Sequence, residues 1–251
     1  MSWKLPTHLP TPQNPPSLLA WQTYGLSPRL ALLAEAVPQG WRAVDVGTDH
    51  ALLPQALVTS GRSPSAIAVD VSPEPLRQAH ARLAGLSLLD RLDLRQGDGL
   101  EPLQRNEAEV LLMAGVSGET VAHVLKQPLS LSQLGLKRVV LQPNDKEPLL
   151  RQTLHHLGWQ TRWERFVADG HRFFWTICAE FTGEESSRQL QKQLVEERFW
   201  TPAAAAQDPL LPAWLTIKQR WLDSIKGTPR PHPLYGADYV QRWRQKLMEM
   251  D

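Results

Sequence analysis

The chain has 251 residues, a formal net charge of +1 and a single cysteine. This length suits one large domain, or one domain with a smaller appendage, and its core needs no disulfide or metal. A charge so close to neutral argues against a protein that binds nucleic acid by electrostatics alone, because such proteins carry a clear basic excess. An enzyme that contacts RNA through a local basic patch is not excluded.

Residues 1–25 form a proline-rich lead-in, which we expect to be extended or flexible. The lead-in has no apolar run of the kind found in signal peptides. Nowhere does the chain contain the roughly 20 consecutive apolar residues of a membrane helix, so we expect no membrane contact. Cys178 lies in an apolar, strand-like run and is interpreted as a buried thiol. One unpaired cysteine suits the reducing cytoplasm.

Helical and strand patterns alternate between residues 26 and 183. The first helix is predicted to begin at Ser27 and Pro28, which are residue types preferred at an N-cap and at a first helical position. Further helices are predicted at 53–58, at 72–83, from 119 onward and at 148–157. Strands are predicted at 41–46, 66–71, 92–97, 110–113 and 138–142, and the continuous apolar run at 66–71 suits a strand buried on both faces. Segments 159–166 and 172–181 suit an antiparallel hairpin.

This order of elements predicts a doubly wound α/β fold with a mostly parallel, seven-stranded, Rossmann-like sheet. After residue 183 the sequence becomes polar and proline-rich, and helices are expected at 184–199, 215–225 and 238–250. We therefore divide the chain into the lead-in, an α/β domain over 26–183 and a small helical appendage over 184–251. The oligomeric state is left open.

Acidic residues at the ends of three successive strands point to a nucleoside ligand. Doubly wound sheets bind ligands at the carboxyl ends of their strands, near the switch in strand order. Asp45 and Asp70 lie at two such ends, and Asp98 stands between Gly97 and Gly99 after the third strand. Asp70 could accept hydrogen bonds from both ribose hydroxyls, as in NAD enzymes. Asp98 could face an adenine amino group.

The loop after the first strand favours S-adenosylmethionine (SAM) over a dinucleotide. Asp49 stands where a second glycine would lie, and a pyrophosphate needs glycines and an open helix N-terminus. SAM has no phosphate but carries a sulfonium and an amino group, which carboxylates can contact. We expect SAM as the cofactor and no metal. The expected cofactor-binding residues are Asp45, Gly47, Thr48, His50, Asp70, Val71, Asp98, Gly99, Ala114 and Gly115.

Residues 45–54, Asp-Val-Gly-Thr-Asp-His-Ala-Leu-Leu-Pro, resemble the signature of the TrmK-type bacterial tRNA (adenine-N1)-methyltransferases, a family of class I SAM methyltransferases. Residues 26–30, 97–100 and 141–144 resemble it too, and the resemblance spans about residues 26–181. It implies methylation of N1 of adenine 22 in the tRNA D-arm. Residues 115–118, Gly-Val-Ser-Gly, depart from the family's usual Gly-Met-Gly-Gly, and prolines interrupt the C-terminal helices.

Adenine N1 carries an in-plane lone pair, so the enzyme implied by this resemblance has mainly to orient its substrates. A carboxylate near the base edge would stabilise developing positive charge or accept a proton. Asp49 is our catalytic candidate, and the alternative is that it caps the next helix. His50 is either another base or a structural histidine. Asn144, the second catalytic candidate, either bonds the base edge or caps the helix before Glu147.

A paired adenine cannot present N1, so the target base must be flipped or unpaired. In the appendage, tryptophans such as Trp214 interleave with basic residues such as Lys218. We expect these tryptophans to pack on the main domain and the charges to be free to touch RNA, although stacking on RNA is the alternative. The expected RNA contacts are Arg29, Arg242, Arg244 and Lys246. Two other functions stay open: a SAM methyltransferase with another substrate, and a non-catalytic SAM- or RNA-binding descendant.

Overall fold

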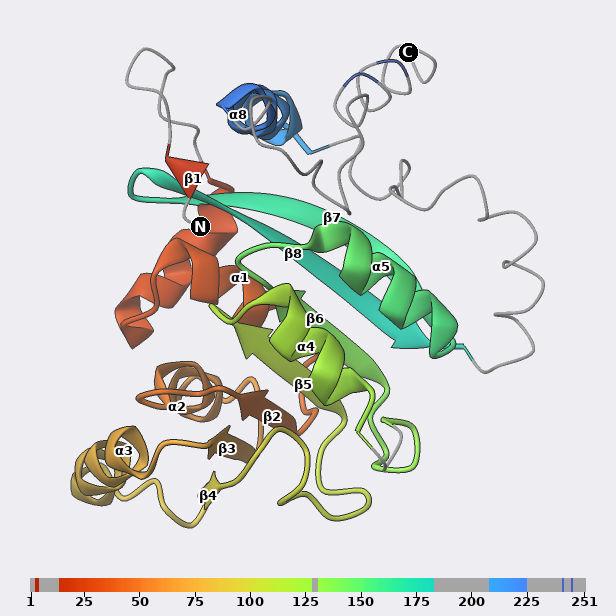
Figure 1. Ribbon diagram of the computed structural model, residues 1–251. Helices are drawn as coiled ribbons and strands as arrows, with labels where there is room; N and C mark the ends of the chain where they lie inside the picture. The colour runs from red at the N-terminus through yellow and green to blue at the C-terminus, as the bar shows by residue number, and fades with distance from the viewer. Residues whose placement is uncertain are drawn as a thin grey trace.

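The computed structural model describes residues 3–4, 14–127, 131–182 and 208–224, together with Gln241 and Gln245 (Figure 1). Arg242, Arg244, Lys246 and the predicted helix at 184–199 lie outside the described residues. The helices are η1 (Pro16–Tyr24, a 3-10 helix), α1 (Pro28–Ala36), α2 (Leu52–Thr59), α3 (Pro73–Gly85), α4 (Gly118–Leu125), α5 (Glu147–His156) and α8 (Leu211–Ser224). The strands are β1 (Trp3–Lys4), β2 (Ala43–Val46), β3 (Ala66–Asp70), β4 (Leu92–Gln96), β5 (Val110–Ala114), β6 (Arg138–Gln142), β7 (Trp159–Asp169) and β8 (Arg172–Phe181).

The sheet confirms the predicted doubly wound topology. Its strands lie in the order β4-β3-β2-β5-β6-β8, and β7 pairs with the other edge of β8. Strands β2 to β6 pair in parallel, whereas β8 runs antiparallel to β6 and β7. These are the seven predicted strands. An eighth, the two-residue β1, pairs with Arg172 and Phe173 of β8. It is too short to leave a pattern in the sequence.

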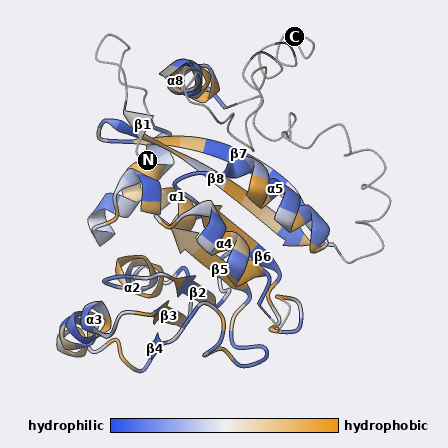
Figure 2. Ribbon diagram, in the orientation of Figure 1, coloured by the Kyte–Doolittle hydropathy of each residue, from blue (hydrophilic) through white to orange (hydrophobic). Residues whose placement is uncertain are grey.

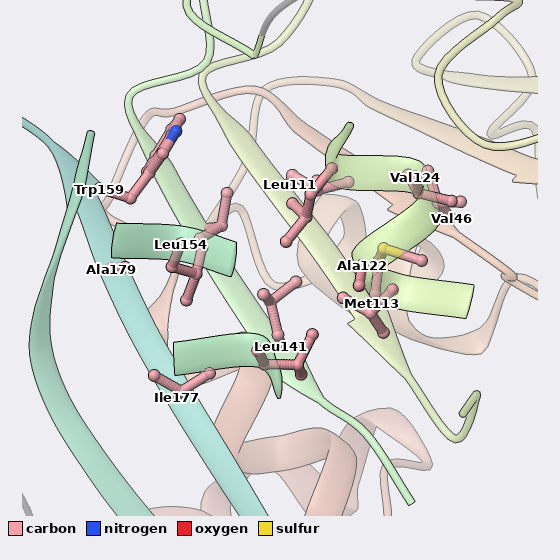
Figure 3. Packing of buried hydrophobic residues seen from close by; sticks show 14 of the residues in the cluster. Val46, Leu111, Met113, Ala122, Val124, Leu141, Leu154, Trp159, Ile177 and Ala179 are labelled. Carbon is pink, nitrogen blue, oxygen red and sulfur yellow. The ribbon is translucent and has the colours of Figure 1, made fainter. Parts of the chain in front are cut away.

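Side chains alternate between the two faces of the sheet along the central strands, so helices cover both faces and the fold has three layers. Leu111 and Met113 of β5 point to the face covered by α4 and α5, while Val110 and Leu112 point to the face covered by α1. Figure 3 shows the first face, where α4 and α5 side chains meet those of β5 and β6. Helices α4 and α5 lie in front of the sheet in Figure 1 and α1 lies behind it. Hydrophobic residues accordingly dominate the middle strands (Figure 2).

The lead-in is more ordered than the sequence predicted. Residues 16–24 form η1, whose Leu18 and Trp21 are buried against α1. Asn14 exchanges two hydrogen bonds with the backbone of Ala168, through its Nδ2 at 2.6 Å and its Oδ1 at 3.0 Å. Pro16, the first residue of η1, is the last proline of the lead-in, so Leu18 and Trp21 can form an apolar face that packs on the domain. The expectation of an extended or flexible lead-in is therefore wrong for residues 14–25.

Helix α8 packs into the core of the α/β domain. Trp214 is 1% exposed, and its ring lies 5.0 Å from that of Phe166 on β7. Lys218 is fully buried and bonds both carboxylate oxygens of Glu147, at 3.0 and 3.1 Å. The prediction that Trp214 packs on the main domain is confirmed. The expectation that Lys218 is free to touch RNA is wrong, because a buried cation needs its buried partner.

The division at residue 183 stays a prediction, but α8 shares its core with the α/β domain. Within the part of the chain that the structure describes, no helix is long and apolar enough to cross a membrane. The same residues contain no group of three or more histidine, cysteine or acidic side chains placed to hold a metal ion.

Candidate active site

The polar loops after the parallel strands meet at one edge of the sheet. Strand β2 pairs with both β3 and β5, so the order of strands reverses beside it. The loops that follow β2, β3, β5 and β6 are therefore neighbours at the carboxyl edge, where doubly wound folds bind ligands. Backbone angles and hydrogen bonds explain the residue types found in each of these loops.

Gly47 lets the loop after β2 turn sharply against its neighbours. Its φ is +76°, and a Cβ there would lie 3.3 Å from Cγ1 of Val116 in the loop after β5. The amides of Gly47 and Thr48 both donate to the carbonyl of Val69, at 2.9 and 3.1 Å. A side chain at position 47 would thus be strained and crowded.

Asp70 fixes the next residues of the loop after β2. Its Oδ2 accepts from the amide of Asp49 and its Oδ1 from the amide of Ser72, both at 2.9 Å. Asp49 and Ala51 have left-handed φ values of 52° and 53°, which cost free energy in residues other than glycine. Each Asp70 oxygen can still accept a second hydrogen bond. Asp70 therefore supports the loop and can also bind a ligand.

Asp49 presents its carboxylate to solvent. Its side chain is 70% exposed, and its Oδ1 lies 3.6 Å from Nε2 of His50. The N-cap of α2 is Ala51, with no side-chain cap bond, so the alternative in which Asp49 caps that helix is wrong. The His50 carbonyl accepts from Arg82 of α3. Arg82 of α3 thus anchors the loop after β2, a role that the sequence around Arg82 does not indicate.

Asp45 is a buried carboxyl at the end of β2. Burial raises its pKa to about 7, although a hydrogen bond from Oγ1 of Thr48 opposes the shift. The neighbouring Asp70 carboxylate raises that pKa further, and the Arg29 guanidinium lowers it. The bond from Thr48 is 2.7 Å long. A negative charge at Asp45 is thus costly unless a cation or a donor lies beside it.

We expect Asp45→Asn to stabilise the protein by about 1–2 kcal/mol at pH 8, and to have little effect at pH 4. The Asp45 carboxyl ionises near pH 4 when unfolded but near pH 7 when folded. Stability should therefore fall as the pH rises from 4 to 7 and stay low above 7. Asparagine cannot ionise, so the Asp45→Asn variant does not lose stability over this pH range. Denaturant unfolding of both proteins across this range measures the difference, and curves that stay parallel would contradict the assignment.

The loop after β4 is held by Gln127, which the sequence did not reveal. Gln127 accepts from the amide of Leu100 at 2.7 Å and donates to the carbonyl of Asp98 at 3.0 Å. Gly99, at φ +62°, lies so close that a Cβ would come within 2.7 Å of the Gln127 amide group. The Asp98 side chain is 57% exposed and lies 4.0 Å from His123. Its carboxylate is thus accessible at the edge.

Asn144 joins the loops after β5 and β6. Its amide donates to the carbonyl of Val116 at 2.9 Å, and its Nδ2 donates to the carbonyl of Gly115 at 2.6 Å. The N-cap of α5 is Lys146, so the alternative in which Asn144 caps that helix is wrong. The Oδ1 of Asn144 stays at the loop surface as an acceptor, because Asn144 is only half-buried.

Residues 117 and 118 explain the departure from the expected glycine-rich loop. Ser117 is the N-cap of α4, and its Oγ accepts from the amide of Thr120 at 3.1 Å. Gly118 donates to Oδ1 of Asp145 at 2.9 Å. A Cβ at Gly118 would lie 2.5 Å from the carbonyl oxygen of Asp145. The glycine that the close contact requires is thus kept, and Ser117 supplies a helix cap.

The remaining expected cofactor contacts lie along the same edge. Val71 follows Asp70 and is 59% exposed, so an apolar surface adjoins that carboxylate. Ala114 ends β5, and Gly115 follows it at φ +79°. Arg29, expected to contact RNA, extends from the first turn of α1 to Gly115, where a Cβ would lie 3.5 Å from its Nη1. Thus the described site residues gather at one edge.

A tRNA (adenine(22)-N(1))-methyltransferase of Bacillus subtilis (strain 168) is 35% identical over 130 residues, which are 52% of this chain and 54% of the relative. The match thus spans about half the length of that relative. The structure of M. capricolum TrmK with S-adenosyl-homocysteine superposes with a TM-score of 0.69 at 20% identity, over 90% of this chain and 97% of that one.

A candidate tRNA (m1A22) methyltransferase of Streptococcus pneumoniae, in complex with S-adenosyl-L-methionine, gives a TM-score of 0.68 at 25% identity, over 89% of this chain and 98% of that one. The family model described as "Methyltransferase domain" matches residues 26–177, which is more than half of the chain. The chain therefore belongs to the methyltransferase domain family.

Proposed function

We propose that this methyltransferase uses SAM to methylate N1 of an adenine in tRNA, at position 22 of the D-arm. The observation that carries the proposal is the placement of Asp45, Asp70 and Asp98 at the carboxyl ends of the adjacent strands β2, β3 and β4, beside the Asp49-His50 loop. The names of the Bacillus subtilis and Streptococcus pneumoniae relatives support the substrate. An enzyme that acts on tRNA is expected in the cytoplasm.

The residues at this edge fit SAM. Asp70 has free acceptor capacity for ribose hydroxyls, and exposed Val71 offers an apolar contact to an adenine ring. The Asp98 carboxylate is accessible to an adenine amino group. Asp45 is a buried carboxyl that favours a cationic neighbour. When bound, SAM supplies an electrophilic methyl group.

Residues on the acceptor side orient the base rather than activate it. Adenine N1 becomes positively charged as it is methylated, and the N6 amino group becomes acidic enough to give up a proton. The exposed Asp49 carboxylate would stabilise that charge or accept the proton. Asn144, fixed by its bond to Gly115, would offer Oδ1 to the N6 amino group. The proposed RNA contacts at Arg242, Arg244 and Lys246 belong to the C-terminal end of the chain.

Asp49→Asn should lower the rate of methyl transfer by roughly tenfold or more, while tRNA affinity changes little. Asparagine keeps the size of the side chain but removes the charge that acts in the transition state. Single-turnover kinetics with saturating SAM and tRNA isolates this step. Asp90→Asn, an exposed aspartate in the α3–β4 connection, is the matched control. A rate within about twofold of the parent would leave Asp49 with a structural role only.

Transfer of labelled methyl from SAM to bulk tRNA, followed by digestion to nucleosides, tests the proposed function. We expect label in 1-methyladenosine. Label in another nucleoside would contradict the acceptor atom, and the absence of label in tRNA would contradict the substrate. SAM binding without any transfer would favour a non-catalytic descendant.

A further inference from the structure

A buried ion pair joins α8 to the first turn of α5. The side chains of Lys218 and Glu147 are both buried, and Nζ of Lys218 lies 3.0 and 3.1 Å from the two carboxylate oxygens. Burial lowers the pKa of Lys218, while the carboxylates of Glu147 and Asp145 oppose that shift. A buried ion pair contributes little net stability compared with packed apolar side chains, because both ions lose their hydration. Stability alone therefore does not explain why these two charges are buried here.

The place of Glu147 in the chain suggests what the pair does. Glu147 is the first residue of α5, and Asn144, Asp145 and Lys146 directly precede it in the loop after β6. Lys146 has a left-handed φ of 60°, which costs free energy in a residue other than glycine. Such a conformation persists only where surrounding contacts hold it. The loop that carries Asn144 therefore depends on its neighbours for its shape.

Helices α4 and α8 both hold this loop. Oδ1 of Asp145 accepts from the amide of Gly118 at 2.9 Å, and Lys146 forms an ion pair with Glu119, so the loop is tied to the start of α4. Asn144 bonds two carbonyls of the loop after β5. The ammonium group from α8 acts on the same stretch, since it bonds the first residue of α5 and attracts Asp145.

Helix α8 gives this ammonium a firm support. The ring of Trp214 lies 5.0 Å from that of Phe166 on β7. Just before the helix, Oδ2 of Asp208 accepts from the amide of Phe166 at 2.8 Å. Leu211 and Leu215 are buried in the same core. Because α8 is anchored to β7 by these contacts, it can hold Lys218 at a fixed place beside the loop after β6.

We propose that Lys218 is a positioning residue for methyl transfer, an inference that rests on the proposed function. Lys218 is fully buried, so it acts through Glu147 and not on a ligand. Its contact keeps the loop after β6 where Oδ1 of Asn144 can meet the acceptor base. A displacement of about 1 Å in a group that orients a substrate can lower the rate about a hundredfold. A residue beyond the α/β domain expected from the sequence thus completes the acceptor side of the site.

Amide hydrogen exchange in the double variant Lys218→Met, Glu147→Gln tests the positioning role without measuring activity. This variant should fold, because neither position then holds a buried charge without its partner. The amides of Asn144 and Gly118 are hydrogen-bonded within the contacts of this loop, and we expect them to exchange at least about tenfold faster than in the parent. The amide of Gly47, in the loop after β2, should keep the rate of the parent.

Kinetics then shows whether the loop matters for the reaction. In single-turnover reactions with saturating SAM and tRNA, the double variant should transfer methyl about tenfold more slowly. Its SAM affinity should stay within about twofold of the parent. Leu211→Ala is the matched control, because it leaves a cavity at the start of α8 and lowers stability without touching the ion pair. It should keep the rate of the parent and the slow exchange at Asn144.

Each outcome supports or overturns a distinct claim. Parent-like exchange at Asn144 and Gly118 in the double variant would overturn the positioning role, and so would an unchanged rate. An equal loss of rate in Leu211→Ala would overturn it too, because the stability of α8 alone would then matter. A parent protein that transfers no methyl to tRNA would overturn the proposed function, while exchange still decides whether the ion pair holds the loop. Should the double variant fail to fold, Glu147→Gln alone must speed exchange at Asn144, or the role of the pair is lost.

Discussion

Replacing Lys218 with methionine is expected to lower the free energy of unfolding by about 3–5 kcal/mol. Lys218 and Glu147 are 0% and 3% exposed, and each loses its hydration on folding. Burial lowers the pKa of Lys218, while the Glu147 carboxylate opposes that shift. Removing the ammonium would leave Glu147 as a buried charge without its main partner. The expected loss is large because it includes this desolvation penalty as well as the lost bond.

Denaturant unfolding, with equal slopes for parent and variant, measures this loss. The double variant Lys218→Met, Glu147→Gln should recover a large part of it, because neither position then holds a buried charge without its partner. Lys126→Met, an exposed lysine at the end of α4, is the matched control and should change stability by less than about 0.5 kcal/mol. A Lys218→Met variant as stable as the control would mean that α8 does not belong to the core.

Replacing Asp70 with alanine should weaken SAM binding about a hundredfold, equivalent to ~2.7 kcal/mol. The variant loses the proposed bonds to the ribose hydroxyls. It also loses the acceptor for the amides of Asp49 and Ser72, which holds the loop after β2 in its left-handed conformation. Two effects thus add at one residue, which is why we expect more than the loss of a single hydrogen bond.

Calorimetry with SAM gives the affinity, and thermal unfolding shows whether the Asp70→Ala variant is folded. Asp90→Ala removes an exposed carboxylate outside the site and should bind SAM as the parent does. Asp70→Asn keeps an acceptor and the size of the side chain, so its loss should be smaller than that of alanine. If Asp70→Ala folds and binds SAM normally, the strand-end carboxylates are not the cofactor site.

The parts of the fold that the sequence predicted are those with strong local patterns. The apolar run at 66–71 became the buried strand β3, since a strand covered on both faces is almost entirely apolar. The two-residue β1 escaped prediction because its partner strand β8 lies far along the chain, and η1 because it buries only Leu18 and Trp21. Helix α8 was predicted, but its burial depends on long-range contacts.

In the candidate site too, some features could be predicted from the sequence and others could not. Asp45, Asp70 and Asp98 could be predicted because strand ends of a parallel sheet must meet at one edge. The contacts of Asp70 with the amides of Asp49 and Ser72 could not, since they depend on backbone angles within the loops. Gln142 belongs to the stretch 141–144 that resembles the family, but its bonds to Arg29 and Thr176 could not be predicted, since they join distant segments.

The most direct test of the central claim uses two unmodified tRNA transcripts that differ only at position 22. One carries adenine there and the other guanine, and each is incubated with the protein and methyl-labelled SAM. We predict 1-methyladenosine in the first transcript, mapped to position 22, and no label in the second. Equal labelling of both transcripts, or label in a nucleoside other than 1-methyladenosine, would contradict the account.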